Sequence, residues 1–319
     1  MPAAAPSLAF LFPGQGAQTP GFLRVLPAHP HVAATLDEAS EALGMPAGSL
    51  DSSEALRSTV AVQLATLIAG VATARALRAE GIEPDAVAGL SIGTFGAAVT
   101  CGTLAFHDAL RLARFRAECM ERAYPHGYGL AAISGLTERE LARRIEQVRK
   151  ASSDAGAAFI ANVNAPRQIV VAGSDAALDA LMAAVRQNGA RKVQRLAVAV
   201  PSHCALLEGA AAQLIEAFAN VPLAAPRIPY IDNRGGRAIH TADGIRADLA
   251  TNLARPVRWH DGTCVLYEMG ARLFLEMPPG HALSDLARDA FPDARAVAMD
   301  GASLESIAQL IRPATTRAP

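Results

Sequence analysis

The pentapeptide Gly89-Leu90-Ser91-Ile92-Gly93 constrains the fold of this chain more than any other stretch. It follows a short apolar run, Ala86 to Ala88, and small residues come after it, so it predicts a strand that turns sharply into a helix. Glycines two before and two after the serine allow the close backbone approach of such a turn. Ser91 would then be an exposed nucleophile, with the N–H of Ile92 at the helix N-terminus as an oxyanion donor. The alternative is a glycine-rich turn without chemistry.

A second glycine loop follows a predicted buried strand at Leu8 to Phe12. The loop reads Pro13-Gly14-Gln15-Gly16-Ala17-Gln18, and a dinucleotide-binding fingerprint would need a third glycine where Thr19 stands. The glycines expose the backbone N–H of Gln15, which is a candidate second oxyanion donor. A simple surface turn is the competing interpretation.

The helix predicted over Phe106 to Ala123 carries an arginine on its apolar face. Arg116 lies between Leu112 and Met120 at i±4 spacing, whereas the polar residues of the opposite arc are Arg111, Arg114, Glu118, Glu121 and Arg122. A buried guanidinium needs an anion, because an unpaired one costs roughly 3–5 kcal/mol. Either a protein carboxylate supplies the anion, or it arrives with a substrate whose acyl group ends in a second carboxylate.

His203 is the strongest candidate for a general base. It follows a predicted strand over Arg191 to Val200, and we expect it in the first turn of a helix with Ser202 as N-cap. A helix N-terminus disfavours imidazolium and would keep the ring neutral. A lone histidine also occurs as a packing residue, so this role depends on the histidine lying next to Ser91.

Alternating strands and helices predict an α/β fold, with an α/β-hydrolase-like core built on a mostly parallel sheet. From Gly127 the order β-α-β-β-α-β is that of a ferredoxin-like unit. We therefore expect residues 1–126 and 199–319 to form a large catalytic domain, and residues 127–198 to be a small ferredoxin-like domain inserted into it.

Composition excludes several classes of function. The 319 residues are 51% hydrophobic and carry a formal net charge of −1, which gives no basic field for nucleic acid or an anionic membrane. The most apolar helix candidate, Ala61 to Ala74, is too short to span a bilayer and is expected to be buried. Four scattered cysteines without zinc spacing indicate reduced thiols, a cytoplasmic protein and no metal site.

Six motifs occur together in order along the chain: Phe12-Pro13-Gly14-Gln15-Gly16-Ala17-Gln18, Gly89-Leu90-Ser91-Ile92-Gly93, Arg116 with Met120, Ala161-Asn162-Val163-Asn164-Ala165-Pro166, Val200-Pro201-Ser202-His203 and Pro256-Val257-Arg258-Trp259. In this set the chain resembles the malonyl-CoA:acyl-carrier-protein transacylases from residue 8 to about residue 300. The resemblance implies a Ser91–His203 dyad, an oxyanion hole from the Gln15 and Ile92 amides, and pairing of Arg116 with the malonyl carboxylate. It also implies malonyl-CoA as substrate, an acyl-carrier protein with a phosphopantetheine-type thiol as partner, and no tightly bound cofactor.

Two positions depart from the usual family pattern. Leu90 stands where a histidine usually precedes the serine, and Arg258 stands where the fatty-acid enzymes often have glutamine. Because an arginine side chain cannot accept a hydrogen bond, a backbone carbonyl would have to orient His203. The Gly-Leu-Ser-Ile-Gly form and the stretch Tyr124 to Gly129 look most like the transacylase (epsilon) subunit of bacterial malonate decarboxylase. That resemblance implies the decarboxylase carrier subunit as acceptor and other decarboxylase subunits as further partners.

Three other functions stay open. A malonyl transacylase of fatty-acid or polyketide synthesis would use the same residues. A serine thioesterase or carboxylesterase usually adds an acidic third member between serine and histidine, for which Asp154, Asp175 and Asp179 are available. A non-catalytic subunit that docks a carrier protein is the third.

Overall fold

The computed structural model describes residues 7–151 and 156–311. Within these residues the chain forms two sheets, one of six strands and one of four. The eleven helices are α1 Pro30–Leu43, α2 Thr59–Ala79, α3 Gly93–Thr100, α4 Phe106–Ala123, α5 Glu138–Ala151, α6 Asp175–Arg186, α7 Glu208–Phe218, α8 Ala242–Thr251, α9 Trp259–Glu268, α10 Ala282–Ala290 and α11 Leu304–Ile311.

The six-stranded sheet has the order β10-β9-β1-β2-β7-β8. Its strands are β1 Ser7–Phe12, β2 Ala86–Gly89, β7 Tyr230–Ile231, β8 Ala238–Ile239, β9 Ala271–Glu276 and β10 Arg295–Ala298. All neighbours are parallel except β7 and β8, which are antiparallel. The predicted α/β class with a mostly parallel sheet is therefore confirmed.

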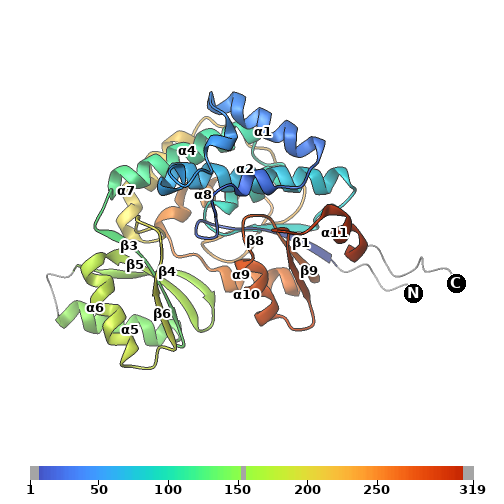
Figure 1. Ribbon diagram of the computed structural model, residues 1–319. Helices are drawn as coiled ribbons and strands as arrows, with labels where there is room; N and C mark the ends of the chain where they lie inside the picture. Colours follow the sequence, from blue (N-terminus) through green and yellow to red (C-terminus); the bar gives the residue numbers. More distant parts are fainter. Residues whose placement is uncertain (1–6, 152–155, 312–319) are drawn as a thin grey trace.

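Both faces of this sheet are covered, because successive side chains along β1 are apolar and point to opposite faces. Phe10 and Phe12 pack into the larger core with α2, α3 and α4. Ala9 and Leu11 face the opposite side and pack with α9 and α10. Figure 1 shows α1, α2 and α4 above the sheet and α9 and α10 below it.

The four-stranded sheet is antiparallel and has the order β4-β5-β3-β6, from β3 Tyr128–Ser134, β4 Ala158–Ala165, β5 Gln168–Ser174 and β6 Lys192–Arg195. With α5 and α6 between its strands it has the β-α-β-β-α-β order predicted for residues 127–198. Helices α5 and α6 pack on one face, and residues of the other face, such as Leu130 and Val170, join the larger core (Figure 1). The division into two domains at residues 127 and 198 stays a prediction.

Two predicted elements differ from the structure. Strand β6 ends at Arg195 instead of Val200. Helix α2 has 21 residues, so the prediction that this helix is too short to span a bilayer was wrong. It has the length and hydropathy of a membrane span, and it is the one such helix among the described residues. However, 89% of the residues in its most apolar window are buried inside the protein, which confirms the expected buried helix.

Candidate active site

Ser91 lies at the sharp turn between β2 and α3, as the sequence predicts. Its φ of 56° is in the left-handed region, which a non-glycine residue adopts only when its surroundings enforce it. A Cβ placed at Gly93 would lie 2.1 Å from the carbonyl oxygen of Phe12, and one at Gly89 would lie 2.1 Å from the carbonyl carbon of Gly93. Both glycines are therefore required by the close packing of β1, β2 and α3 around the serine.

His203 reaches Ser91 from a distant part of the chain. Its Nε2 atom lies 2.7 Å from Ser91 Oγ, and its Nδ1 atom lies 2.8 Å from the backbone carbonyl oxygen of Asn252. Because a carbonyl only accepts, Nδ1 carries the proton in the neutral ring and Nε2 is free to accept from the serine hydroxyl. The orienting group is thus a backbone carbonyl, as predicted.

The predicted place of His203 within a helix is wrong. The residue has a φ of 64° and precedes the short 3-10 turn Ala205–Leu207, while α7 begins only at Glu208. Its backbone N–H donates to the carbonyl of Leu253 at 2.7 Å, so a tertiary contact and not a helix cap fixes the residue. Burial, with the nearby charge of Arg116 as the next cause, lowers the pKa of His203 to about 4. The ring is neutral at pH 7, but desolvation and not the helix dipole is the reason.

Arg116 is completely buried beside Ser91. Its Nη2 donates to Ser91 Oγ at 3.2 Å and to Asn252 Oδ1 at 3.4 Å, and its Nη1 donates to Gln63 Oε1 at 2.7 Å. Burial lowers the pKa of the guanidinium to about 10, which leaves it charged at neutral pH. Within residues 7–151 and 156–311, Arg116 forms no ion pair with a carboxylate, and its Nε–H is buried without a partner. The internal salt bridge that sequence analysis kept open is therefore absent from the described part of the chain.

The two predicted oxyanion donors flank the serine. Ile92 directly follows Ser91 and precedes the first residue of α3. The loop of Gln15 packs against the same turn: a Cβ placed at Gly14, the residue before Gln15, would lie 3.6 Å from the Cβ of Ser91. In the described part of the chain neither the Gln15 N–H nor the Ile92 N–H donates a hydrogen bond to the protein. Both amides thus have the free donor that an oxyanion hole requires.

Three amide side chains that support these groups were not predicted from the sequence. Gln63 and Asn252 accept from the guanidinium of Arg116, and the Nδ2 of Asn252 donates to Thr94 Oγ1 at 3.0 Å. Asn233 accepts from the Ser91 N–H at 2.8 Å and donates to the carbonyl of Gly89 at 2.6 Å. Only Gln63 gave a signal in the sequence, as a polar residue within an apolar helix.

The acidic residues considered for a catalytic triad do not contact His203. Asp175 pairs with Arg195, and Asp179 is exposed on α6. Asp154 lies outside the described residues. Since a backbone carbonyl occupies Nδ1, the described residues form a Ser-His pair without an acidic third member.

The side chain of Arg258 pairs with two acids and not with His203. Its Nη1 atom lies 2.8 Å from Glu138 at the start of α5, and its Nε atom lies 2.9 Å from Asp261 in α9. The arginine that replaces glutamine at this position therefore links α5, which packs on the four-stranded sheet, to α9, which packs on the six-stranded sheet.

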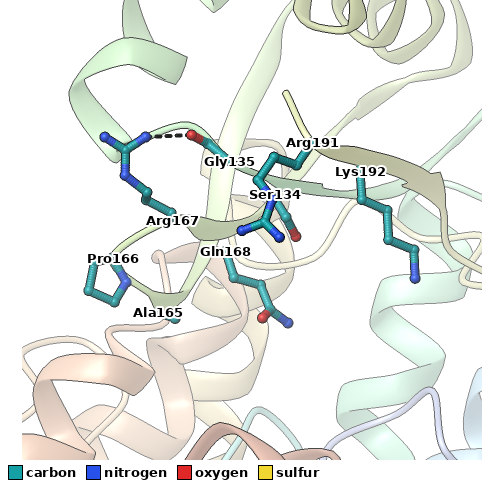
Figure 2. Close-up of a pocket in the computed structure, with 8 residues that line it drawn as sticks. All are labelled: Ser134, Gly135, Ala165, Pro166, Arg167, Gln168, Arg191 and Lys192. Atoms are coloured by element: carbon teal, nitrogen blue, oxygen red, sulfur yellow. Dashed lines mark hydrogen bonds between the residues drawn. The ribbon is translucent and has the colours of Figure 1, made fainter. Parts of the chain in front are cut away.

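A separate surface pocket of about 560 Å³ lies at one end of the four-stranded sheet (Figure 2). Figure 2 shows Gln168, Arg191 and Lys192 pointing to one side, while the guanidinium of Arg167 turns back to the carbonyl of Gly135. None of the predicted site residues lines this pocket. Among the residues with described side chains, no group of three or more His, Cys, Asp or Glu is placed to hold a metal ion.

An α/β fold that presents a strained serine to a neutral histidine, with free amides beside the serine, has the groups that acyl-transfer chemistry requires. Residues 9–317 match the family model described as acyl transferase domain, and the chain belongs to this family. The malonyl CoA-acyl carrier protein transacylase of Escherichia coli strain K12 is 36% identical over 286 residues, which cover 88% of this chain and 91% of that protein.

Solved structures agree with this assignment. The malonyl CoA-acyl carrier protein transacylase of Coxiella burnetii superposes with a TM-score of 0.90 at 32% identity, covering 96% of this chain and 97% of that one. A malonyl-transacylase solved in complex with a type II PKS acyl-carrier protein gives a TM-score of 0.89 at 33% identity, covering 95% and 99%. The chain is thus an acyltransferase by family, fold and site.

Proposed function

We propose that this acyltransferase moves a malonyl group from malonyl-CoA to the thiol of an acyl-carrier protein through an ester on Ser91. The observation that carries the proposal is the buried guanidinium of Arg116, which donates to Ser91 Oγ and forms no ion pair with any described carboxylate. A guanidinium in this position suits an acyl group that ends in a carboxylate. The names of the relatives support the same substrate and acceptor.

The first half-reaction forms the acyl-enzyme. His203 Nε2 takes the Ser91 proton while Oγ bonds to the thioester carbonyl carbon, and the Gln15 and Ile92 amides stabilise the negative oxygen. The carbon–sulfur bond then breaks, and the leaving CoA sulfur receives the proton from His203. Arg116 holds the free carboxylate of the malonyl group, so the acyl group is fixed at both ends.

The second half-reaction reverses these roles with a new thiol. His203 takes the proton of the carrier's phosphopantetheine-type thiol, and the thiol sulfur bonds to the carbonyl carbon of the ester. The bond from that carbon to Ser91 Oγ then breaks, and His203 returns the proton to the serine oxygen. No step requires a tightly bound cofactor.

Two acceptors compete as the physiological partner. The Gly-Leu-Ser-Ile-Gly form favours the carrier subunit of malonate decarboxylase, with other decarboxylase subunits as partners. The comparisons instead favour the alternative, a transacylase of fatty-acid or polyketide synthesis, because one relative is bound to a type II PKS carrier and the others carry the general transacylase name. We therefore propose a fatty-acid or polyketide carrier as the main acceptor. A cytoplasmic location stays a prediction.

The test measures transfer and hydrolysis together. Purified protein is mixed with malonyl-CoA and either a fatty-acid, a polyketide or a malonate decarboxylase carrier protein, each with its thiol-bearing arm, and Ser91→Ala is the control. We expect malonyl-carrier to form much faster than free malonate, with the highest kcat/KM on a fatty-acid or polyketide carrier. Release of malonate without an acceptor, at a rate that matches transfer, would establish the thioesterase instead.

A further inference from the structure

Asp248 is a buried acid that the proposed reaction does not use. It lies on α8 with no exposed surface, and its carboxylate accepts from the hydroxyl of Tyr230 at 2.7 Å and from the backbone N–H of Asn233 at 3.2 Å. The Nε atom of Arg234 is 3.8 Å away on a partly exposed side chain. Burial of a carboxylate is costly, so these contacts hold the group in one place.

The side chain of Asp248 is linked to the nucleophile through Asn233. The amide of Asn233 accepts from the Ser91 N–H and donates to the carbonyl of Gly89, so it fixes the backbone on both sides of Leu90. The left-handed backbone of Ser91 persists only if its surroundings determine it. By holding the Asn233 backbone, Asp248 contributes to that constraint.

The backbone of Asp248 is linked to the histidine. Its carbonyl oxygen accepts from the backbone N–H of Asn252, which is the residue that ends α8. The carbonyl of Asn252 in turn accepts from His203 Nδ1. Asp248 is thus hydrogen-bonded both to Asn252, whose carbonyl orients His203, and to Asn233, whose side chain holds the backbone of Ser91.

We infer that Asp248 is a positioning residue that sets Ser91 and His203 relative to one another and works in its ionised form. A charged acceptor holds the Asn233 N–H more strongly than a neutral one. The inference rests on the proposed function only where malonyl-CoA is used as the substrate. The reactivity of Ser91 itself can be measured without that assumption.

The groups that face the carboxylate determine when it is ionised. They are Tyr230 on β7, Asp232 and Arg234 in the turn that follows, and the Asn233 N–H. Burial, with a smaller contribution from Asp232, raises the pKa of Asp248 to about 6, and the hydrogen bond from Tyr230 opposes this rise. As the pH is lowered, Asp248 therefore becomes protonated at a higher pH than His203, whose pKa is about 4. The rate at which Ser91 reacts should decrease in two steps as the pH falls.

The experiment measures the reactivity of Ser91 without relying on the substrate. A fluorophosphonate probe bonds to the oxygen of an activated serine and releases fluoride and the serine proton. We expect Asp248→Asn to lower the rate constant of labelling at pH 7.5 by roughly tenfold to a hundredfold, as for loss of a hydrogen bond to a charged group. The step near pH 6 should disappear while the step near pH 4 remains. With malonyl-CoA, kcat should fall and KM should stay unchanged.

Two further variants make the result specific. Asp243→Asn changes an exposed acid on the same helix and should match the wild type. Tyr230→Phe removes the hydrogen bond that favours the ionised carboxylate, so it should move the upper step to higher pH, and it tests the inference even if Asp248→Asn does not fold. A wild-type labelling rate in Asp248→Asn, a retained step near pH 6 in that variant, or an unmoved step in Tyr230→Phe would overturn the inference. Failure of malonyl transfer with normal probe labelling would instead contradict only the proposed function.

Discussion

His203 Nε2 lies 2.7 Å from Ser91 Oγ although 112 residues separate them in the chain. The contact joins the turn after β2 to the segment that follows the four-stranded sheet, and the carbonyl of Asn252 after α8 orients the ring from behind. The proposed acyl transfer therefore depends on three segments that meet only in the folded chain.

The first prediction concerns the base. Replacing His203 with Asn removes the proton acceptor but keeps a small polar side chain. We expect the rate of Ser91 acylation by malonyl-CoA, measured by rapid quench, to fall by roughly 10²–10⁴-fold, the usual contribution of a general base. A rate within the error of the wild type would show that the serine proton leaves by another route.

The second prediction concerns Arg116. Arg116→Ala should lower kcat/KM for malonyl transfer by about two to three orders of magnitude, because truncation of one member of a buried charge pair costs roughly 2–5 kcal/mol. Transfer of an acetyl group, which has no second carboxylate, should fall much less. Arg111→Ala, which removes an exposed arginine from the same helix, is the matched control. Equal losses with both substrates would remove Arg116 from substrate recognition.

The third prediction concerns Arg258. Because Asn252 orients His203, Arg258→Gln should leave acylation essentially unchanged. It removes partly exposed ion pairs to Glu138 and Asp261, so we expect a loss of about 1 kcal/mol or less in the free energy of unfolding. Denaturant unfolding and single-turnover acylation measure the two effects. A slow but fully stable variant would mean that position 258 orients the base.

The fourth prediction concerns stability in acid. The pKa of His203 falls from 6.5 to about 4 on folding, so its burial costs stability as the pH drops through this window, by about 3 kcal/mol. The pKa of Asp248 rises from 3.8 to about 6 on folding, so the native state binds this proton at a higher pH than the unfolded state does. As the pH falls over nearly the same window, this group therefore increases the free energy of unfolding by about 3 kcal/mol. The two contributions oppose each other.

We therefore expect the Asp248→Asn variant to lose stability more steeply than the wild type between about pH 6 and pH 4, since it keeps only the contribution of His203. Urea unfolding at a series of pH values measures this difference. Parallel stability curves for the two proteins would show that Asp248 does not bind a proton in this window.

The groups proposed to carry the chemistry could be predicted from the sequence because each has a local signature. Ser91 lies between required glycines, Arg116 lies on an apolar helix face, and the β-α-β-β-α-β pattern appears from Gly127 onward. The supporting residues have no such signature. Asn233, Asn252 and Asp248 act through hydrogen bonds to residues far away in the chain, and their spacing resembles that of any polar residue in a loop or helix.

The errors have the same origin. His203 was expected in a helix because polar and apolar spacing continues from Ser202 to Phe218, but a tertiary hydrogen bond to Leu253 holds it in a left-handed turn before the helix. Helix α2 extends beyond its most apolar stretch, Ala61 to Ala74, because Ser58 caps its N-terminus and packing against the core continues to Leu77. Local pattern determined the elements, and packing determined where they end.

The most direct test of the account is the intact mass of the purified protein after brief mixing with malonyl-CoA, followed by peptide mapping. The account predicts an increase by the mass of one malonyl group, located on the peptide that contains Ser91, absent from Ser91→Ala and removed by an acyl-carrier thiol. An unmodified mass under conditions that support transfer, or a malonyl group on another residue, would contradict it.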